Sequence, residues 1–549
     1  LTQAVNPTTV TVRRVHPSRR ITRQGILPKA RMTQAQALAI LKTGANVFLT
    51  GEPGSGKTHT VAQYMAYLRA HGVEPAITAS TGIAATHLHG MTIHSWSGIG
   101  VKPALTPSDL ERIADNNRVA ARIRRTSALI IDEISMLSAA TLDAVEAVCR
   151  KVRASSQPFG GLQVVLVGDF FQLPPVARDG AAVQFAFASP TWQLMSPLVC
   201  YLDEQHRQED TAFLEVLTAI RANACTTTHL AALNARLGEH RAVAATVTRL
   251  FPHNVDVDGV NQRRLALIVG EPRVFLMHAR GPQPLVEALR KGCLSPEKLE
   301  LKVGAVVMFT KNNPGDGVVN GTLGTVTDFD DDSGHPMVAL RSGRSVEAAP
   351  LEWAVEEGGR TRATITQVPL RLAWAITVHK SQGMSLDAAV IDLAAAFAFG
   401  QGYVALSRVR RLSGIHLLGY NQRALAVHPD VLARDRTFRN QSVAAQAAWA
   451  KRSPAELAQQ QEQFMVASGG KLVRRSTAPV RASSPVDATP LAGIRTRYPQ
   501  AYRAWTPEEE ARLRQLFAAG ATTLDLAKAL GRRRAGVRSR LRQLGLMRY

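Results

Sequence analysis

Short apolar runs separated by longer helical patterns mark the first part of the chain. The apolar runs lie at residues 47–50, 75–80, 128–131 and 163–167, and the helical patterns lie at 34–43 and 57–71. Buried strands that alternate with helices predict a parallel sheet covered on both faces. Between Gly98 and about Arg125 the strand signal lapses, and we expect an inserted helical element there.

A second α/β region begins at about Tyr201 and ends near Tyr420. It is interrupted from about 303 to 370, where short β-like runs are divided by turns rich in Gly and Asp. That pattern is typical of a small antiparallel barrel inserted in a loop. We therefore expect an α/β protein with two parallel-sheet domains, at residues 31–200 and 201–440.

The segments outside these two domains have a different character. Residues 1–30 are basic and contain no acidic residue, so we expect a disordered arm. Residues 441–501 turn from Ala- and Gln-rich to Ser- and Pro-rich, which predicts a linker.

The last segment, residues 502–549, predicts a compact module of three short helices. Thr506, Pro507 and the acidic residues 508–510 form a helix start, and Gly520 and Gly531 end the first and second helices. The third helix, at 532–542, is strongly basic, which is typical of a helix-turn-helix or Myb/SANT-like module. We expect it to contact duplex DNA. The alternative is a three-helix bundle that docks on protein, and no base-reading residue can be assigned.

Composition narrows the class of protein. A chain of 549 residues with 45% hydrophobic and 20% charged residues is expected to be globular and to contain several domains. The formal net charge of +23 favours a polyanionic partner, most commonly nucleic acid, over a merely solvated basic surface. The four cysteines form no C-x-x-C pair, and no apolar run is long enough to span a membrane. We expect a cytoplasmic protein with neither a zinc site nor a membrane partner.

A complete phosphate-binding loop follows the first apolar run. Residues 51–58, Gly-Glu-Pro-Gly-Ser-Gly-Lys-Thr, fit the pattern G-x-x-x-x-G-K-[ST] between a strand and a helix. Its glycines let backbone N–H groups turn toward phosphate oxygens at a helix N-terminus. Lys57 is predicted to reach the β- and γ-phosphates of ATP, and Thr58 to hold Mg²⁺. The predicted nucleotide contacts in this segment are Gly51, Gly54, Ser55, Gly56, Lys57, Thr58 and His59.

Two further strand ends carry the other half of the predicted site. The run at 128–131 ends in Asp132 and Glu133. Asp132 is expected to bind Mg²⁺ through water, and Glu133 to orient or deprotonate the attacking water. The run at 163–167 leads to Gln172, which we expect beside the γ-phosphate, although a plain strand-end turn would show the same pattern.

Several blocks occur in a characteristic order between about residues 32 and 420. They lie at 32–36, 78–95, 132–137, 168–175, 204–208, 375–385 and 402–409. In order and composition they resemble superfamily 1 helicases of the 5′-to-3′ branch, specifically the PIF (petite integration frequency) family. The resemblance implies two RecA-like domains, a helical wedge at 98–125 and an SH3-like β-barrel at about 303–370.

The resemblance also assigns roles to single residues. It implies that Gln36 reads adenine, since a glutamine amide can donate and accept along the base edge. It implies that Arg207 reaches the γ-phosphate and that Arg408 is an arginine finger supplied by the second domain. The residues it places near single-stranded DNA are Thr81, Gly82, His94, His379 and Lys380.

The resulting hypothesis is an ATP- and Mg²⁺-dependent DNA helicase that moves 5′-to-3′ on single-stranded DNA. The resemblance implies action at single-strand/duplex junctions, forks, R-loops and G-quadruplexes in genome maintenance, and we expect a monomer. One alternative is a recombination subunit or relaxase-linked helicase of the same branch. Another is a DNA-binding regulator that uses ATP only as a switch. The set Glu133, Gln172, Arg207 and Arg408 argues against the switch, which needs less hydrolytic machinery.

Overall fold

The protein is described here from a computed structural model. The residues that it describes are 32–88, 90–100, 105–175, 184–203, 210–238, 247–252, 257–313, 316, 318–340, 343–357, 360–472, 498–500, 503, 505–521, 523–533, 536–537, 540–541, 544 and 546. The basic arm expected at 1–30 lies outside them. No helix within these residues is long and apolar enough to cross a membrane.

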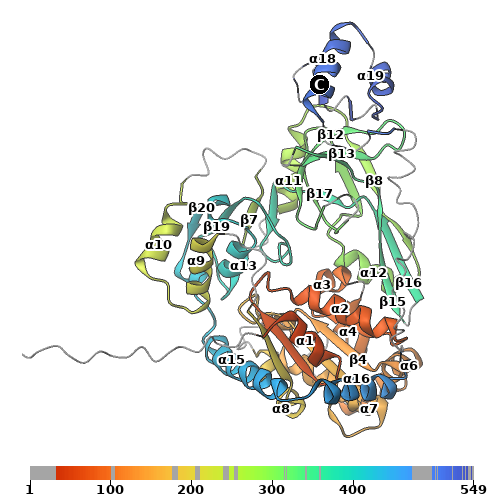
Figure 1. Ribbon diagram of the computed structural model, residues 1–549, viewed down its shortest axis with the longest axis vertical. Coiled ribbons are helices and arrows are strands. Elements are labelled where there is room, and N and C mark those ends of the chain that lie inside the picture. Colours follow the sequence, from red (N-terminus) through yellow and green to blue (C-terminus); the bar gives the residue numbers. More distant parts are fainter. Residues whose placement is uncertain are drawn as a thin grey trace, which may run out of the picture.

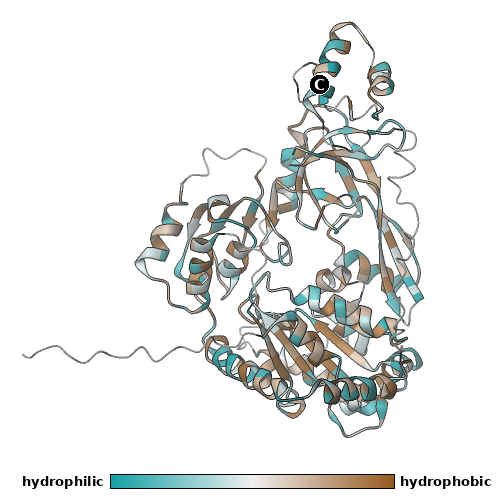
Figure 2. Cartoon of the chain, in the orientation of Figure 1, coloured by the Kyte–Doolittle hydropathy of each residue, from teal (hydrophilic) through white to brown (hydrophobic). Residues whose placement is uncertain are grey.

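The first core is a six-stranded parallel sheet in the order β3-β2-β4-β5-β1-β6. Its strands are β1 (Val47–Gly51), β2 (Ala76–Ala79), β3 (Met91–Thr92), β4 (Ala128–Asp132), β5 (Gln163–Val167) and β6 (Leu198–Leu202). Helices α1 (Gln34–Leu41), α2 (Lys57–Ala70), α7 (Ala139–Arg153) and α8 (Pro190–Met195) accompany it. Figure 2 shows that the strands are hydrophobic and that the helices around the sheet have hydrophilic outer faces. The predicted parallel sheet is confirmed.

One predicted boundary is wrong. The second domain was expected from residue 201, but Tyr201 and Leu202 belong to β6, which pairs in parallel with β1. The apolar run at 198–202 therefore completes the first sheet instead of starting the second.

The expected helical insertion is present. Within the expected bounds it contains α5 (Pro107–Ala114) and α6 (Asn117–Arg125), and α4 (Ile93–Ser97) directly precedes it. Thr106 begins α5 with a capping box, and its side chain accepts from Asp109 N. Ile113 and Ile123 are buried in the main hydrophobic core, which anchors the insertion to the first sheet.

The second core is a four-stranded parallel sheet in the order β18-β7-β19-β20. Its strands are β7 (Arg249–Phe251), β18 (Ala375–Thr377), β19 (Ala389–Leu393) and β20 (Ile415–Tyr420). Helices α9 (Thr211–Arg221), α10 (Thr227–Asn234) and α13 (Gln401–Ser407) gather around it in Figure 1. The molecule is thus a mixed α/β protein with two parallel sheets, as expected.

Antiparallel strands separate β7 from β18 along the chain. Five of them form a sheet in the order β14-β13-β12-β11-β17, and three form a second sheet, β15-β16-β9. Their bounds are β9 (His278–Arg280), β11 (Val306–Phe309), β12 (Leu323–Phe329), β13 (Pro336–Leu340), β14 (Ser345–Glu347), β15 (Leu351–Glu357), β16 (Arg360–Gln367) and β17 (Leu370–Leu372). The region also contains α11 (Val257–Ala266), α12 (Gln283–Gly292) and a β8 (Arg273–Leu276)–β10 (Lys298–Leu301) pair. An antiparallel insert is confirmed, but it begins before 303, and its SH3-like character stays a prediction.

The linker predicted at 441–501 is wrong for its first part. After the short α14 (Gln422–Leu425), the chain forms α15 (Pro429–Ala450) and α16 (Pro454–Ala467), which run along the base of the first core in Figure 1. Tyr201 N donates to Ser442 Oγ at 3.0 Å, and Gln461 Nε2 donates to the Ala39 carbonyl at 3.2 Å. Met465 is buried in a cluster with residues of α1 and β1. Ala and Gln favour helices, so this composition indicated a helix pair rather than a linker.

The C-terminal segment contains α18 (Pro507–Ala518) and α19 (Thr523–Ala529), close to β12 and β13 in Figure 1. The predicted helix start at Thr506 is confirmed, because its side chain accepts from Glu509 N in a capping box. A small separate core contains Leu513, Leu526 and Val537. The third predicted helix, at 532–542, falls partly on residues outside the described ones.

Candidate active site

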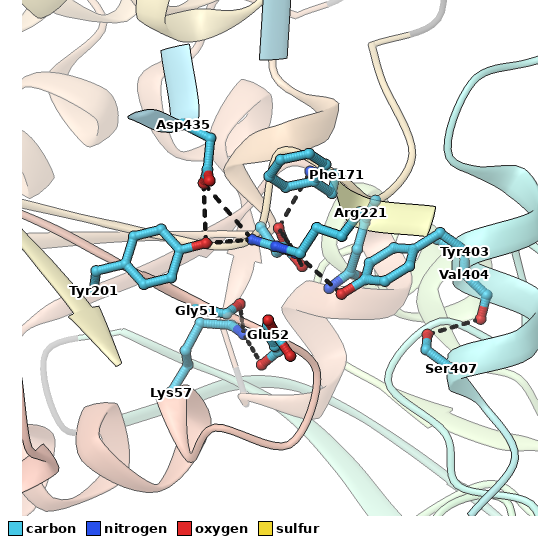
Figure 3. Close-up of polar contacts among 12 residues, drawn as sticks. Gly51, Glu52, Lys57, Phe171, Tyr201, Arg221, Tyr403, Val404, Ser407 and Asp435 are labelled. Atoms are coloured by element: carbon cyan, nitrogen blue, oxygen red, sulfur yellow. Dashed lines mark hydrogen bonds and ion pairs between the residues drawn. The ribbon is translucent and has the colours of Figure 1, made fainter. Parts of the chain in front are cut away.

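The phosphate-binding loop joins β1 to α2 in a conformation that its glycines allow. Gly56 has φ of 87°, and a Cβ there would lie 2.2 Å from Gln34 Nε2. Any larger residue would collide with that amide. Lys57 Nζ donates to the carbonyls of Gly51 at 2.8 Å and Glu52 at 3.0 Å, so it crosses the loop from inside (Figure 3). Ser55 Oγ is buried, and no described residue gives it a hydrogen bond.

The acidic pair lies at the end of β4, at the same edge of the sheet: Asp132 is the last residue of the strand and Glu133 follows it. Asp132 Oδ1 accepts from Glu133 N at 2.8 Å, and Glu133 has φ of 52°, a left-handed conformation that is uncommon outside glycine. Burial raises the pKa of both carboxyl groups, and the charge of Lys57 opposes that shift. The nearby Asp132 also raises the Glu133 pKa, whereas Arg408 lowers it. A carboxyl group tuned upward in this way suits a general base near neutral pH.

A cavity of about 460 Å³ lies between the two cores at this edge. Its first wall carries the phosphate loop, Glu133 and Gln172, and its second wall carries residues that follow β18 and α13. The lining residues are Pro53, Gly54, Gly56, Lys57, Thr58, Glu133, Gln172, Gly383, Ser385, Arg408 and Arg410. The structure therefore brings Lys57, Thr58, Glu133, Gln172 and Arg408 together, as the sequence predicted.

Arg408 is buried at the end of α13. Its Nε donates to the Val404 carbonyl at 2.9 Å, and its Nη2 donates to Ser407 Oγ at 2.9 Å. These bonds hold the guanidinium against its own helix, facing the cavity. Movement of α13 relative to the first core would therefore move Arg408 relative to Glu133.

Gln382 was not identified from the sequence. Its Nε2 donates to Glu133 Oε2 at 3.0 Å and lies 3.4 Å from Gln172 Oε1. One side chain of the second core thus contacts two predicted catalytic residues of the first. Its place in the block at 375–385 was the signal that the sequence offered, and the sequence alone did not indicate which way the amide points.

A second cavity, of about 570 Å³, lies beside the first. Residues after β2, residues of the antiparallel insert and residues after β18 form its walls. The lining residues are Thr58, Thr81, Ile83, Ala84, Leu88, Asp132, Glu133, Met136, Lys311, Asn312, Val319, Asn320, Trp353, His379, Gln382, Gly383, Ser385 and Arg410. It brings Thr81 and His379 together, and it adds Lys311, whose ammonium lies 5.1 Å from the Trp353 ring centroid.

The other predicted DNA residues do not line this cavity. His94 is part-buried on α4, and burial lowers its pKa. A Cβ on Gly82 would lie 3.2 Å from the Cα of Gly292, so this end of helix α3 (Gly82–His87) packs closely on α12. Burial also lowers the pKa of Lys380, and its backbone N–H donates to Thr377 Oγ1.

Two residues that were predicted to contact the nucleotide, Gln36 and His59, do not line the first cavity, and a third, Arg207, is not described by the structure. Gln36 Oε1 accepts from Thr33 N at 3.0 Å and from Gln446 Nε2 at 3.1 Å, so it caps α1 and contacts α15. His59 is exposed on the first turn of α2. Arg207 lies outside the described residues.

Comparisons with known proteins agree with this arrangement. A family model described as PIF1-like helicase matches residues 29–228, and one described as DNA helicase Pif1, 2B domain, matches residues 285–329. The ATP-dependent DNA helicase Pif1 of a Psychrobacter species is 44% identical over 507 residues, which are 81% of this chain and 77% of that protein.

Two solved structures are also similar. The crystal structure of a Bacteroides Pif1 in complex with ADP-AlF4 has a TM-score of 0.66 at 30% identity, and the match covers 75% of this chain and 97% of that one. The crystal structure of Bacteroides Pif1 bound to ssDNA has a TM-score of 0.52 at 31% identity and covers 74% and 97%.

Proposed function

The chain belongs to the PIF1-like family of ATP-dependent DNA helicases, and from that premise we propose that it moves 5′-to-3′ on single-stranded DNA and unwinds the duplex ahead of it. The family assignment made from the ordered blocks is confirmed, and so is an ATP-driven DNA helicase as the enzyme class. Forked duplexes, R-loops and G-quadruplexes are the proposed substrates, and genome maintenance is the proposed role.

One observation carries the proposal. Five residues line both cavities, namely Thr58, Glu133, Gly383, Ser385 and Arg410. A nucleotide in the first cavity and a DNA strand in the second would share that wall. A change at the γ-phosphate would therefore alter contacts on the strand without any long relay.

The predicted catalytic residues act together on the γ-phosphate. Lys57 neutralises phosphate charge, Glu133 orients and deprotonates the attacking water, and Gln172 contacts the γ-phosphate. Arg408 offers a planar fork for the phosphoryl oxygens when the second core closes. Arg207 is proposed as a further γ-phosphate contact, and Gln36 is proposed as the adenine reader. The side-chain oxygen of Gln36 already accepts two hydrogen bonds within the protein.

The residues around the phosphate loop also fit Mg²⁺. Thr58 lines both cavities and Asp132 lines the second one beside it, and hydroxyl and carboxylate oxygens are ligands that this ion prefers. Thr58 would hold the ion directly and Asp132 through water. When bound, Mg²⁺ would neutralise charge that develops on the β- and γ-phosphates.

Single-stranded DNA is the proposed occupant of the second cavity. The ssDNA named for the similar Bacteroides structure supports this. Thr81 and His379 are proposed as direct contacts, and Lys311 joins them as a cation near an aromatic ring. Gly82, His94 and Lys380 stay proposed contacts further along the strand.

The C-terminal module is proposed to contact duplex DNA ahead of the junction in a monomeric enzyme. Some of its arginines are engaged within the protein: Arg532 pairs with Glu509 at 2.7 Å, and Arg540 pairs with Glu510. The exposed cations Arg512, Arg514 and Lys528 are the described groups that we assign to the duplex.

Strand displacement on tailed duplexes tests the direction of movement. With ATP present, the enzyme should unwind a duplex that carries a 5′ single-stranded tail and leave a 3′-tailed duplex intact. Lys57→Ala should abolish unwinding on both substrates. Unwinding of the 3′-tailed duplex alone would overturn the proposed direction.

A further inference from the structure

We propose that Arg221 is a positioning residue that joins the loop after β5 to the helix that carries Arg408 and serves as the pivot about which the second core closes. The proposal rests on the proposed role of Arg408 as an arginine finger. Arg221 ends α9 in the second core and is not part of any of the helicase blocks.

The guanidinium of Arg221 contacts both cores directly. Its Nη1 donates to Asp169 Oδ1 at 2.9 Å and Oδ2 at 2.8 Å, and also to Tyr403 Oη at 3.0 Å. Asp169 follows β5 in the loop that leads to Gln172, and Tyr403 lies on α13. One cationic group therefore connects the loop that contains Gln172 to α13, the helix that leads to Arg408 (Figure 3).

Burial makes this bridge hard to break. The side chains of Arg221 and Asp169 are 4% and 0% exposed, and the guanidinium carbon lies 3.9 Å from the Phe171 ring centroid. A charge in such a place is stable only with its partner. The two cores can therefore rotate about this contact more easily than they can separate at it.

Tight packing forms a second link between the same loop and α13. Gly400, which begins α13 with φ of 79°, lies against the backbone of the loop. A Cβ on Gly400 would lie 2.6 Å from the carbonyl oxygens of both Phe171 and Gln172. A displacement of Gln172 would therefore displace the start of α13 through Gly400, as well as its middle through Arg221 and Tyr403.

The other contacts of Arg221 reach the first core. Its Nη2 donates to Tyr201 Oη at 2.7 Å, and Tyr201 Oη in turn donates to Asp435 Oδ1 on α15 at 2.9 Å. Tyr201 lies on β6, just before the chain passes into the second core. Arg221 therefore lies where the two cores join, which is where a pivot has to be.

A double-mutant cycle with Arg408 tests the proposal. We would measure kcat and KM for ATP at saturating oligo-dT, and the affinity for a non-hydrolysable ATP analogue. Arg408→Ala should lower kcat by roughly 10³-fold, the lower end for arginine fingers. Arg221→Gln alone should lower kcat by about 10-fold or more with little change in analogue affinity. In the Arg408→Ala background the same substitution should lower kcat by less than about 2-fold, because residues that act as a unit are not additive.

Two further variants address folding. Tyr403→Phe removes only one hydroxyl group and should fold normally, yet it should lower kcat in the wild-type background and not in the Arg408→Ala background. Arg439→Gln is the matched control. Arg439 contacts Tyr201 and Asp435, and within the described part of the chain it makes no hydrogen bond or ion pair with Asp169 or Tyr403, so the kcat of this variant should stay near that of the wild type.

The outcomes distinguish the positioning role of Arg221 from the finger role of Arg408. Equal fold-losses from Arg221→Gln and Tyr403→Phe in both backgrounds would overturn the positioning role while leaving the finger in place. An unchanged kcat in Arg408→Ala would overturn the finger and the positioning role together. Loss of analogue affinity in Tyr403→Phe in parallel with kcat would also contradict the proposal.

Discussion

Gln382 links the two cores through the carboxylate that is proposed to activate water. Its hydrogen bond to Glu133 favours the ionised form and so lowers the Glu133 pKa, against the burial that raises it. The base works only when ionised, so activity should fall as the pH drops through this pKa. Gln382→Ala should therefore move the acid limb of the kcat–pH profile to higher pH. A shift to lower pH would contradict the assignment, and Gln459→Ala, at an exposed position on α16, serves as control.

The sequence alone was enough to predict one site that contains Lys57, Glu133, Gln172 and Arg408. Three of them follow strands of one parallel sheet, whose carboxyl ends share an edge, and the fourth follows from the order of the blocks. Gln382 and Arg221 could not be predicted in the same way. Their roles depend on how one core lies against the other, and no local pattern records that.

Helix α15 spans the predicted boundary at residue 440, and it packs on the first core rather than on the second domain to which its first half was assigned. Phe438 on this helix is buried and lies 5.0 Å from Phe48 and 5.9 Å from Trp192 between ring centroids. Phe438→Ala should lower the free energy of unfolding by about 3–5 kcal/mol, because it removes a large ring and leaves a cavity. Val443→Ala, at a half-exposed position on the same helix, should change it by less than about 0.5 kcal/mol.

Denaturant titrations of the two variants measure this difference. Equal stability of Phe438→Ala and Val443→Ala would show that α15 does not stabilise the first core. The periodicity of α15 is weak because only Val431, Phe438 and Ser442 are buried over its 22 residues. With so few buried positions, the sequence does not indicate which surface the helix covers, and only the tertiary structure shows it.

The C-terminal module is attached to the antiparallel insert by an ion-pair cluster. Arg533 pairs with Asp330 at 2.6 Å and with Glu347, and both carboxylates belong to the insert. While it is held there, Arg533 is directed at carboxylates and not at DNA phosphates. The combined change Asp330→Asn and Glu347→Gln should therefore strengthen duplex binding and steepen its salt dependence by about one counterion.

Duplex affinity measured over a series of salt concentrations checks this expectation, with exposed Asp332→Asn as the control. Weaker duplex binding in the double variant would mean instead that docking on the insert presents the module correctly.

The two parallel sheets and the antiparallel insert were predictable because hydrophobic periodicity marks them. The docking of the module was not, because ion pairs between distant surfaces leave no pattern in the sequence.

Steady-state ATP hydrolysis with and without oligo-dT is the most direct test of a wall shared between the two cavities. The strand should raise kcat by about 10-fold or more, corresponding to ~1.4 kcal/mol in the barrier. Most of that stimulation should be lost in Gln382→Ala, which removes the side chain that borders the second cavity, the proposed DNA site, and contacts Glu133. An ATP turnover that is the same with and without DNA in the wild-type enzyme would contradict the shared wall and the motor built on it.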